Sequence, residues 1–116
     1  MENKKTINVL LIDDHPIVLN GLKSLLDGNE TIRIIADSNN GLEALSILKE
    51  KRIDLVISDI SMPEMDGIEF TKELKLKYPE TKVLLLTAHN EKEILKRALF
   101  SGAEACLLKN TSKKNC

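Results

Sequence analysis

Five residues that can bind a metal ion or a phosphoryl group stand at the ends of short apolar runs. They are Asp13, Asp14, Asp59, Thr87 and Lys109. Three carboxylates brought together repel one another and need a cation, and an all-oxygen ligand set suits Mg²⁺. A carboxylate is also a nucleophile for phosphoryl transfer, and a cation, an ammonium group and a hydroxyl can offset the charge on the phosphoryl oxygens. Brought together, these residues would form a Mg²⁺-dependent phosphoryl-transfer site.

Strand-like and helical patterns alternate along the chain and position these residues. Apolar runs predict strands at Ile7 to Ile12, Ile32 to Ala36, Leu55 to Ser58, Val83 to Leu86 and Cys106 to Leu108. Helical spacing predicts helices at Pro16 to Leu26, Gly41 to Lys49, Asp66 to Tyr78 and Glu91 to Phe100. Asp66 is a candidate N-cap, and Pro79 and Gly102 mark helix ends.

Strands almost free of polar residues, alternating with helices, are typical of a parallel sheet covered on both faces. Right-handed crossovers leave few topologies. We expect an α/β fold with a doubly wound five-stranded sheet in the order 2-1-3-4-5, an order taken from known sheets of this kind. Such sheets bind ligands at the carboxyl ends of their strands, where the five residues stand.

Composition sets limits on function. The chain has 116 residues, which suits one domain, and its net charge of -1 argues against nucleic-acid binding. The apolar run Val9 to Ile12 is too short for a signal peptide or a membrane span, so we expect a cytoplasmic protein without membrane contact. Two cysteines without CxxC spacing indicate neither a disulfide framework nor a zinc site.

Each candidate residue also has a purely structural explanation when it is taken alone. Acidic residues before a helix interact favourably with the positive end of the helix dipole. An aspartate after a strand suits a turn, and a threonine in a strand usually packs against its neighbours. A single lysine is usually exposed to solvent, and we expect the side chains of His15 and His89 to face solvent as well. These explanations do not account for the joint placement at four strand ends.

Four segments resemble the receiver domain of two-component response regulators. The segment LIDDHPIVLNGL (Leu11 to Leu22) resembles the start of receivers in the NarL/FixJ (LuxR-type) branch, and SDISMPEMDG (Ser58 to Gly67) resembles the phosphoacceptor loop. Leu85 to His89 and Gly102 to Lys109 resemble the last two site strands. The resemblance covers Val9 to Lys109 and implies a flavodoxin/CheY-like fold.

The resemblance implies a role for each acidic residue. Asp59 would accept a phosphoryl group from the phosphohistidine of a sensor histidine kinase. Asp14 and Asp59 would ligate Mg²⁺ directly, together with the backbone carbonyl of Ser61, and Asp13 would hold the ion through water. The protein would then be a signalling phosphoswitch that catalyses only its own phosphorylation and dephosphorylation.

The resemblance also assigns the remaining residues of the site. Lys109 would pair with the phosphoryl group, and Thr87 would turn inward to bond it. Ser61 and His89 would tune how fast the acyl phosphate hydrolyses. The switch would control a transcriptional output domain.

Two features depart from the family pattern. Cys106 occupies the position where receivers carry Tyr or Phe, and we expect it to pack between the fourth helix and fifth strand without changing rotamer. Asn110 to Cys116 is too short for a fifth helix, so we expect that helix to be truncated or absent. Residues 1–116 would then be a receiver alone, with a DNA-binding helix-turn-helix only in a longer parent protein.

A missing fifth helix would uncover apolar surface on the first helix and the fifth strand. Because Leu107 and Leu108 point to opposite faces, one of them would face the gap, beside some of Ile17, Val18 and Leu25. We expect two chains to pair through this surface as a homodimer, or the C-terminal tail to fold back over it.

Three other functions fit parts of the pattern. A flavodoxin-like carrier needs a Ser/Thr/Gly-rich phosphate loop where Asp13 to Pro16 stands, and a haloacid-dehalogenase-type phosphatase needs a D-x-D pair that is absent after the first strand. A pseudo-receiver that acts only as an interaction module is the remaining alternative. It would normally have lost an acidic or lysine position, and all are kept here.

Overall fold

A five-stranded parallel sheet forms the middle layer of the computed structural model, which describes residues 6–62, 65–88 and 92–108. Its strands are β1 (Ile7–Ile12), β2 (Ile32–Ser38), β3 (Leu55–Asp59), β4 (Lys82–Thr87) and β5 (Ala105–Leu108). The helices are α1 (Pro16–Leu26), α2 (Gly41–Glu50), α3 (Gly67–Lys77) and α4 (Lys92–Phe100). The strand order β2-β1-β3-β4-β5 confirms the predicted α/β fold. The expected absence of a fifth helix concerns residues outside those described.

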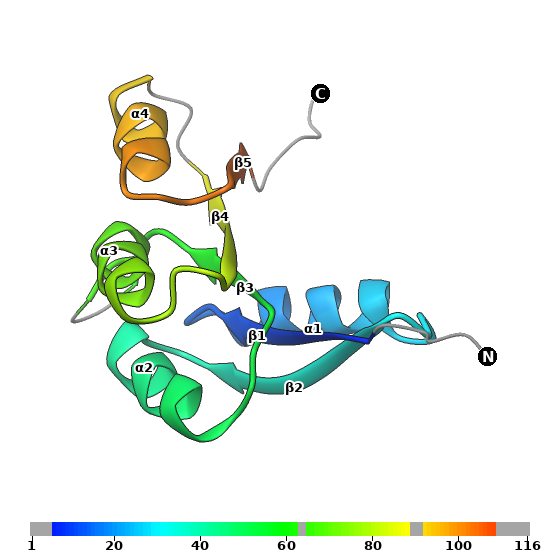
Figure 1. Cartoon of the computed structure of the whole chain (residues 1–116). Helices are drawn as coiled ribbons and strands as arrows, with labels where there is room; N and C mark the ends of the chain where they lie inside the picture. The colour runs from blue at the N-terminus through cyan, green and yellow to red at the C-terminus, as the bar shows by residue number, and fades with distance from the viewer. Residues whose placement is uncertain (1–5, 63–64, 89–91, 109–116) are drawn as a thin grey trace, which may run out of the picture.

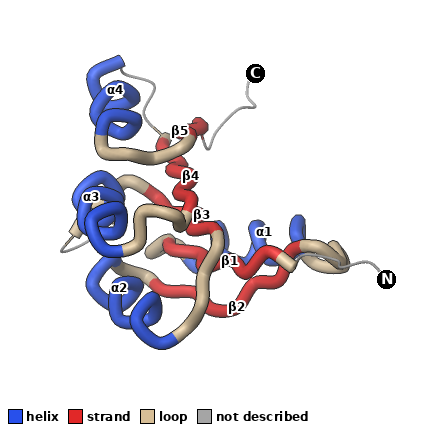
Figure 2. The backbone as a smooth tube through the Cα atoms, viewed as in Figure 1, coloured by secondary structure: helices blue, strands red, loops and turns tan. Residues whose placement is uncertain are grey.

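The helices divide unequally between the two faces of the sheet. Figures 1 and 2 show α2, α3 and α4 together on one face and α1 on the other. Leu10 and Ile12 belong to the larger core under the three helices, whereas Val9 and Leu11 belong to a smaller core that includes residues of α1. Alternate residues of β1 are therefore buried on opposite faces, as expected for a central parallel strand.

Helix α1 packs loosely on its face of the sheet. None of its residues is fully buried, and Leu19, Leu22 and Leu26 contact the smaller core while only partly covered. The side chains of Ile17 and Leu25 are 84% and 79% exposed. The chain thus leaves apolar surface on α1 among the described residues.

Local sequence sets the ends of the helices. Asn40 and Asp66 are the N-caps of α2 and α3, and their side chains accept hydrogen bonds of 2.8 Å from the backbone N–H groups of Glu43 and Glu69. The predicted capping role of Asp66 is therefore confirmed. Gly102 follows α4 with φ of +110°, a conformation that favours glycine.

Several helices and strands extend one or two residues beyond their predicted ends. β2 continues to Ser38, β3 to Asp59 and β4 from Lys82 to Thr87, because backbone pairing extends past the last apolar side chain. β5 likewise begins at Ala105 and α2 reaches Glu50. The predicted start of the last helix, Glu91, lies outside the described residues.

Candidate phosphoacceptor site

The register of the central strands brings two aspartates side by side. The last pair between β1 and β3 joins Ile12 to Ser58, so Asp13 and Asp59 follow at the same edge of the sheet. The backbone N–H of Asp13 donates to the Ser38 carbonyl over 3.0 Å, which ties the start of this loop to β2. The predicted convergence at the carboxyl ends is therefore present for these two residues.

A group of four side chains, here called the acidic cluster, consists of Asp13, Asp14, His15 and Asp59. One donor atom from each lies within 4.8 Å of the others. The carboxylates of Asp13 and Asp59 are almost completely buried, whereas Asp14 is exposed. Buried carboxylates this close are costly without a cation, and their oxygen atoms are the ligands that a hard ion such as Mg²⁺ prefers. The residues present fit such an ion.

His15 is a member of the cluster that the sequence interpretation missed. Its Nδ1 lies 2.9 Å from Asp13 Oδ1, 3.0 Å from Asp14 Oδ1 and 4.0 Å from Asp59 Oδ2. The side chain is 60% exposed, as expected. Its ring nitrogen nevertheless belongs to the site. Its place directly after the acidic pair was the available signal.

Backbone hydrogen bonds hold Ile60, Ser61 and Gly67 close to Asp59. The Ser61 backbone N–H donates to Asp59 Oδ1 over 3.4 Å, and the Ile60 N–H donates to the Leu86 carbonyl over 2.9 Å. Further along, the Gly67 N–H donates to the Ile60 carbonyl over 2.7 Å. The start of α3 is thus held directly against the acidic site.

The predicted hydroxyl is also at the right edge of the sheet. Thr87 is buried at the end of β4, directly after Leu86, which pairs with Asp59. Thr87 itself pairs with Leu108, the residue before Lys109. Lys109 and His89 lie outside the described residues, so their predicted roles stay predictions.

Cys106, half-buried in β5, packs against the larger core, to which Ile94 of α4 also belongs. The expected packing between α4 and β5 and the absence of rotamer exchange both stay predictions. Burial raises the pKa of the Cys106 thiol. The thiol form is therefore favoured at neutral pH.

A separate ion pair joins α3 to the start of β5. Lys75 Nζ lies 2.9 Å from Glu104 Oε2, and Glu104 Oε1 accepts a bond of 2.8 Å from the Val83 N–H. Burial alone would raise the pKa of Glu104, but the bonds from Val83 and Lys75 and the nearby lysine charges together lower it. These contacts stabilise the edge of the sheet that carries β5.

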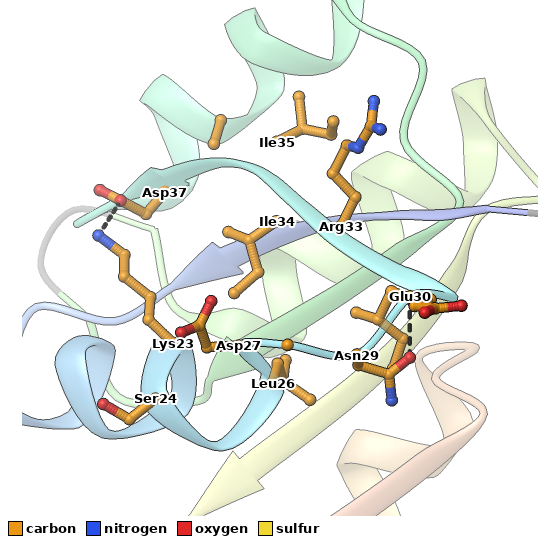
Figure 3. A pocket seen from close by; sticks show the side chains of 13 residues that line it. Lys23, Ser24, Leu26, Asp27, Asn29, Glu30, Arg33, Ile34, Ile35 and Asp37 are labelled. Carbon is orange, nitrogen blue, oxygen red and sulfur yellow. Dashed lines mark hydrogen bonds and ion pairs between the residues drawn. The ribbon is translucent and has the colours of Figure 1, made fainter.

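A hollow of about 700 Å³ lies between α1 and β2, and Figure 3 shows the side chains that line it. Lys23 and Asp37 form an ion pair of 2.6 Å at this hollow, and Arg33, Asp27 and Glu30 add charges of both signs. None of its lining residues belongs to the acidic cluster. The hollow is therefore separate from the candidate site.

Comparison with protein-family models identifies the domain. The model of the response regulator receiver domain matches residues 9–116. The chain belongs to this family. The match favours a receiver over the flavodoxin-like carrier and the phosphatase, and it agrees with the acidic cluster at the carboxyl ends of the strands.

Receiver relatives include two bacterial regulators. Over 95% of this chain, the sequence is 38% identical to the response regulator protein VraR of Staphylococcus aureus. Over 90% of this chain, it is 37% identical to the uncharacterized transcriptional regulatory protein YhcZ of Bacillus subtilis. These matches cover 53% and 49% of the relatives. The chain thus spans about half the length of the curated relatives it matches.

Solved receiver structures share the fold of this one. The receiver domain of the putative response regulator NarL from Mycobacterium tuberculosis has a TM-score of 0.87 and 30% identity, with 93% of this chain and 87% of that one covered. The isolated receiver domain of RcsB from Salmonella enterica serovar Typhimurium, solved with the phosphomimetic BeF₃⁻, has the same score and identity, with 93% and 80% covered. In the described part of this receiver, no helix has the length and apolar character of a membrane span.

Proposed function

We propose that this receiver accepts a phosphoryl group on Asp59 in a reaction that requires Mg²⁺. The observation that carries the proposal is the placement of Asp13, Asp14 and Asp59 together at the carboxyl edge of the sheet. Asp59 is 3% exposed and ends the central strand, so its carboxylate is held in place before any reaction begins. Preorganised groups in a site of low dielectric are a large source of catalysis.

The reaction joins an Asp59 carboxylate oxygen to phosphorus while the bond from phosphorus to the donor's leaving group breaks. With a sensor histidine kinase as donor, the leaving group is the imidazole nitrogen of its phosphohistidine. The product is an acyl phosphate, and its hydrolysis returns the Asp59 carboxylate and inorganic phosphate. The receiver therefore catalyses only its own modification and is not an enzyme with a separate substrate.

The cation would be held by Asp14, Asp59 and the backbone carbonyl of Ser61, with Asp13 acting through water. A divalent ion at this position offsets the negative charge of the carboxylates and of the incoming phosphoryl oxygens. Thr87, at the end of β4, would donate a hydrogen bond to the phosphoryl group, and Lys109 would pair with its charge. Movement of Thr87 toward that group would begin the conformational switch.

The proposed output is transcription, exerted through a domain of a longer parent protein. The relatives support this, because YhcZ is described as a transcriptional regulatory protein and the chain matches only about half of it. A structure of RcsB bound to a promoter also aligns with this receiver at 30% identity and a TM-score of 0.85. The receiver would contact no nucleic acid itself, and its cytoplasmic location stays a prediction.

We also propose that the receiver forms a homodimer through α1 and β5. The exposed apolar side chains of Ile17 and Leu25 on α1 support this, as does Leu107 of β5, which is 53% exposed. Leu107 pairs with Leu86, which contacts the smaller core on the α1 face. Burying such surface between two chains would provide a driving force for association.

The test of the main proposal is to locate the phosphoryl group by mass spectrometry after treatment with a small phosphodonor and Mg²⁺. Modification of Asp59 supports a phosphoswitch. An unmodified protein that still binds its partner would instead support the pseudo-receiver, which acts only by interaction.

A further inference from the structure

His15 is held at the edge of the acidic cluster by the residue two positions before it. Asp13 Oδ1 accepts a hydrogen bond of 2.9 Å from the His15 backbone N–H and lies 2.9 Å from the ring Nδ1. Pro16 follows at the first turn of α1 and fixes the backbone there. As the N-cap of α1, His15 makes no side-chain capping bond to the helix, so its ring is directed toward the carboxylates instead.

The distances around Nδ1 match the positions of ligand atoms around a single ion. With metal–ligand bonds of about 2.1 Å, neighbouring ligand atoms of an octahedron lie about 3.0 Å apart and opposite ones about 4.2 Å apart. Nδ1 lies 3.0 Å from Asp14 Oδ1 and 4.0 Å from Asp59 Oδ2, oxygens of the two carboxylates proposed to bind the ion directly. The ring nitrogen therefore occupies a position that a fourth ligand could take.

An imidazole ligand changes which ions a carboxylate site prefers. Mg²⁺ favours oxygen ligands and keeps several waters, whereas imidazole suits ions such as Ni²⁺, Zn²⁺ and Cu²⁺. Nδ1 can bind an ion through its lone pair when the ring proton is on Nε2, and it can donate to a carboxylate when the proton is on Nδ1. The same side chain can thus serve the site with and without such an ion.

We propose that His15 is an additional ligand through which the acidic cluster binds borderline divalent transition-metal ions more tightly than Mg²⁺. The proposal rests on the metal site of the proposed function and extends it to the choice of ion. With Mg²⁺, the carboxylates and water suffice and His15 adds little. With a transition-metal ion, the Nδ1 bond adds affinity that the carboxylates alone cannot supply.

Calorimetric titration of the apo-protein with NiCl₂ and, separately, with MgCl₂ tests this at one fixed pH. His15→Asn removes the ring nitrogen but keeps a side chain that suits an N-cap. We expect its Ni²⁺ affinity to fall about tenfold or more, since even outer-sphere partners of a metal are worth that much. Its Mg²⁺ affinity should stay within about threefold of the wild-type value, because Mg²⁺ gains little from nitrogen.

Asp27→Asn is the control, because Asp27 is an exposed carboxylate outside the acidic cluster. It should leave Ni²⁺ affinity unchanged. In NMR spectra of the wild-type protein, substoichiometric Ni²⁺ should broaden the His15 ring signals. His15→Ala, checked for its fold by circular dichroism, provides a second variant with the same expected loss.

Any of three results would overturn the inference. The first is a wild-type protein that binds Ni²⁺ no more tightly than Mg²⁺, and the second is a Ni²⁺ affinity that is unchanged in both His15 variants. The third is a Mg²⁺ affinity that falls as far as the Ni²⁺ affinity in those variants. The last result would show that His15 only positions the carboxylates. These results are independent of the proposed function, which fails if Asp59 is not phosphorylated whichever ion His15 prefers.

Discussion

Gly67 lies directly against the peptide that joins Asp59 to Ile60. A Cβ atom on Gly67 would lie 2.9 Å from the Cα of Ile60 and closer still to the carbonyl oxygen of Asp59. These atoms of Asp59 and Ile60 belong to the backbone, which cannot move aside as the end of a flexible side chain can. The first residue of α3 therefore has to be glycine for this helix to start as close to the Asp59 backbone as it does.

Gly67→Ala should consequently destabilise the protein by about 1–3 kcal/mol, the usual cost of overpacking. It should also slow phosphorylation, because the Asp59 backbone must shift. Urea unfolding and the rate of modification by a small phosphodonor measure the two effects. Gly21→Ala is the control, since nothing lies within 4 Å of a Cβ there and alanine favours a helix interior by up to about 1 kcal/mol. Equal effects at the two glycines would contradict the close approach.

Glu104 should make the stability of the fold depend on pH in the acid range. Its pKa is lowered from the ordinary value of 4.5, so its contribution is present above that value and is lost as pH falls through the lower folded pKa. Glu104→Gln should therefore cost on the order of 1 kcal/mol at pH 7, an amount kept small because the side chain is 42% exposed. Urea unfolding of both proteins between pH 7 and pH 3 should show the difference shrinking.

The control for Glu104 is Glu80→Gln, which changes an exposed glutamate. It should leave the pH dependence as in the wild type. A cost of Glu104→Gln that stays the same from pH 7 to pH 3 would show that the carboxylate charge is not what stabilises this edge of the sheet.

Cys106 should react slowly with thiol reagents while the protein is folded. Burial raises the pKa of its thiol, and the thiolate is the reactive form. In a Cys116→Ser background, alkylation by iodoacetamide at pH 7.5 should be several-fold slower in buffer than in denaturing urea. The rate should also keep rising with pH past the ordinary cysteine pKa of 9.0. A rate in buffer that matches the rate in urea would mean that Cys106 is not protected.

Leu25→Glu should weaken the proposed homodimer. Leu25 is 79% exposed on α1, and burying a side chain of this size contributes about 1.5–3 kcal/mol for each of the two copies in a dimer, so losing both should lower the affinity by about a hundredfold or more. Sedimentation at micromolar concentration should show dimers of the wild type and monomers of the variant.

Leu76→Glu is the matched control for the dimer, because Leu76 is 81% exposed but belongs to α3 on the other side of the sheet. It should not change the association state. A wild-type protein that is strictly monomeric, or association lost equally in both variants, would contradict pairing through α1 and β5.

The sequence predicted the helices and strands closely because hydrophobic pattern and backbone geometry agree along most of the chain, whereas the strand order was taken from known sheets. The predicted bounds of β1 and α1 match the structure, and Asp66 was recognised as a cap. Strand ends were placed too early where polar residues such as Ser38 and Asp59 continue the backbone pairing. The pattern of apolar side chains in a sequence indicates which residues are buried. The length of a strand depends instead on backbone hydrogen bonding to the neighbouring strands.

Residues of the site were harder to predict where their roles depend on close contact. The carboxylates followed from strand ends, but the approach of His15 Nδ1 depends on the turn formed by Asp13. The need for glycine at position 67 likewise depends on how near α3 comes to the Asp59 backbone. Such approaches arise from tertiary packing, which spacing in a sequence does not report.

The central claim is that Asp59 is the single phosphoacceptor and that a divalent cation is required. Wild-type protein, Asp59→Asn and the exposed-site control Asp27→Asn are treated with acetyl phosphate and Mg²⁺, and the products are mapped by mass spectrometry. We predict one phosphoryl group on Asp59 in the wild type and the control, and none in Asp59→Asn or after addition of EDTA. Phosphorylation of Asp59→Asn to the wild-type extent, or full phosphorylation of the wild type in EDTA, would contradict the account.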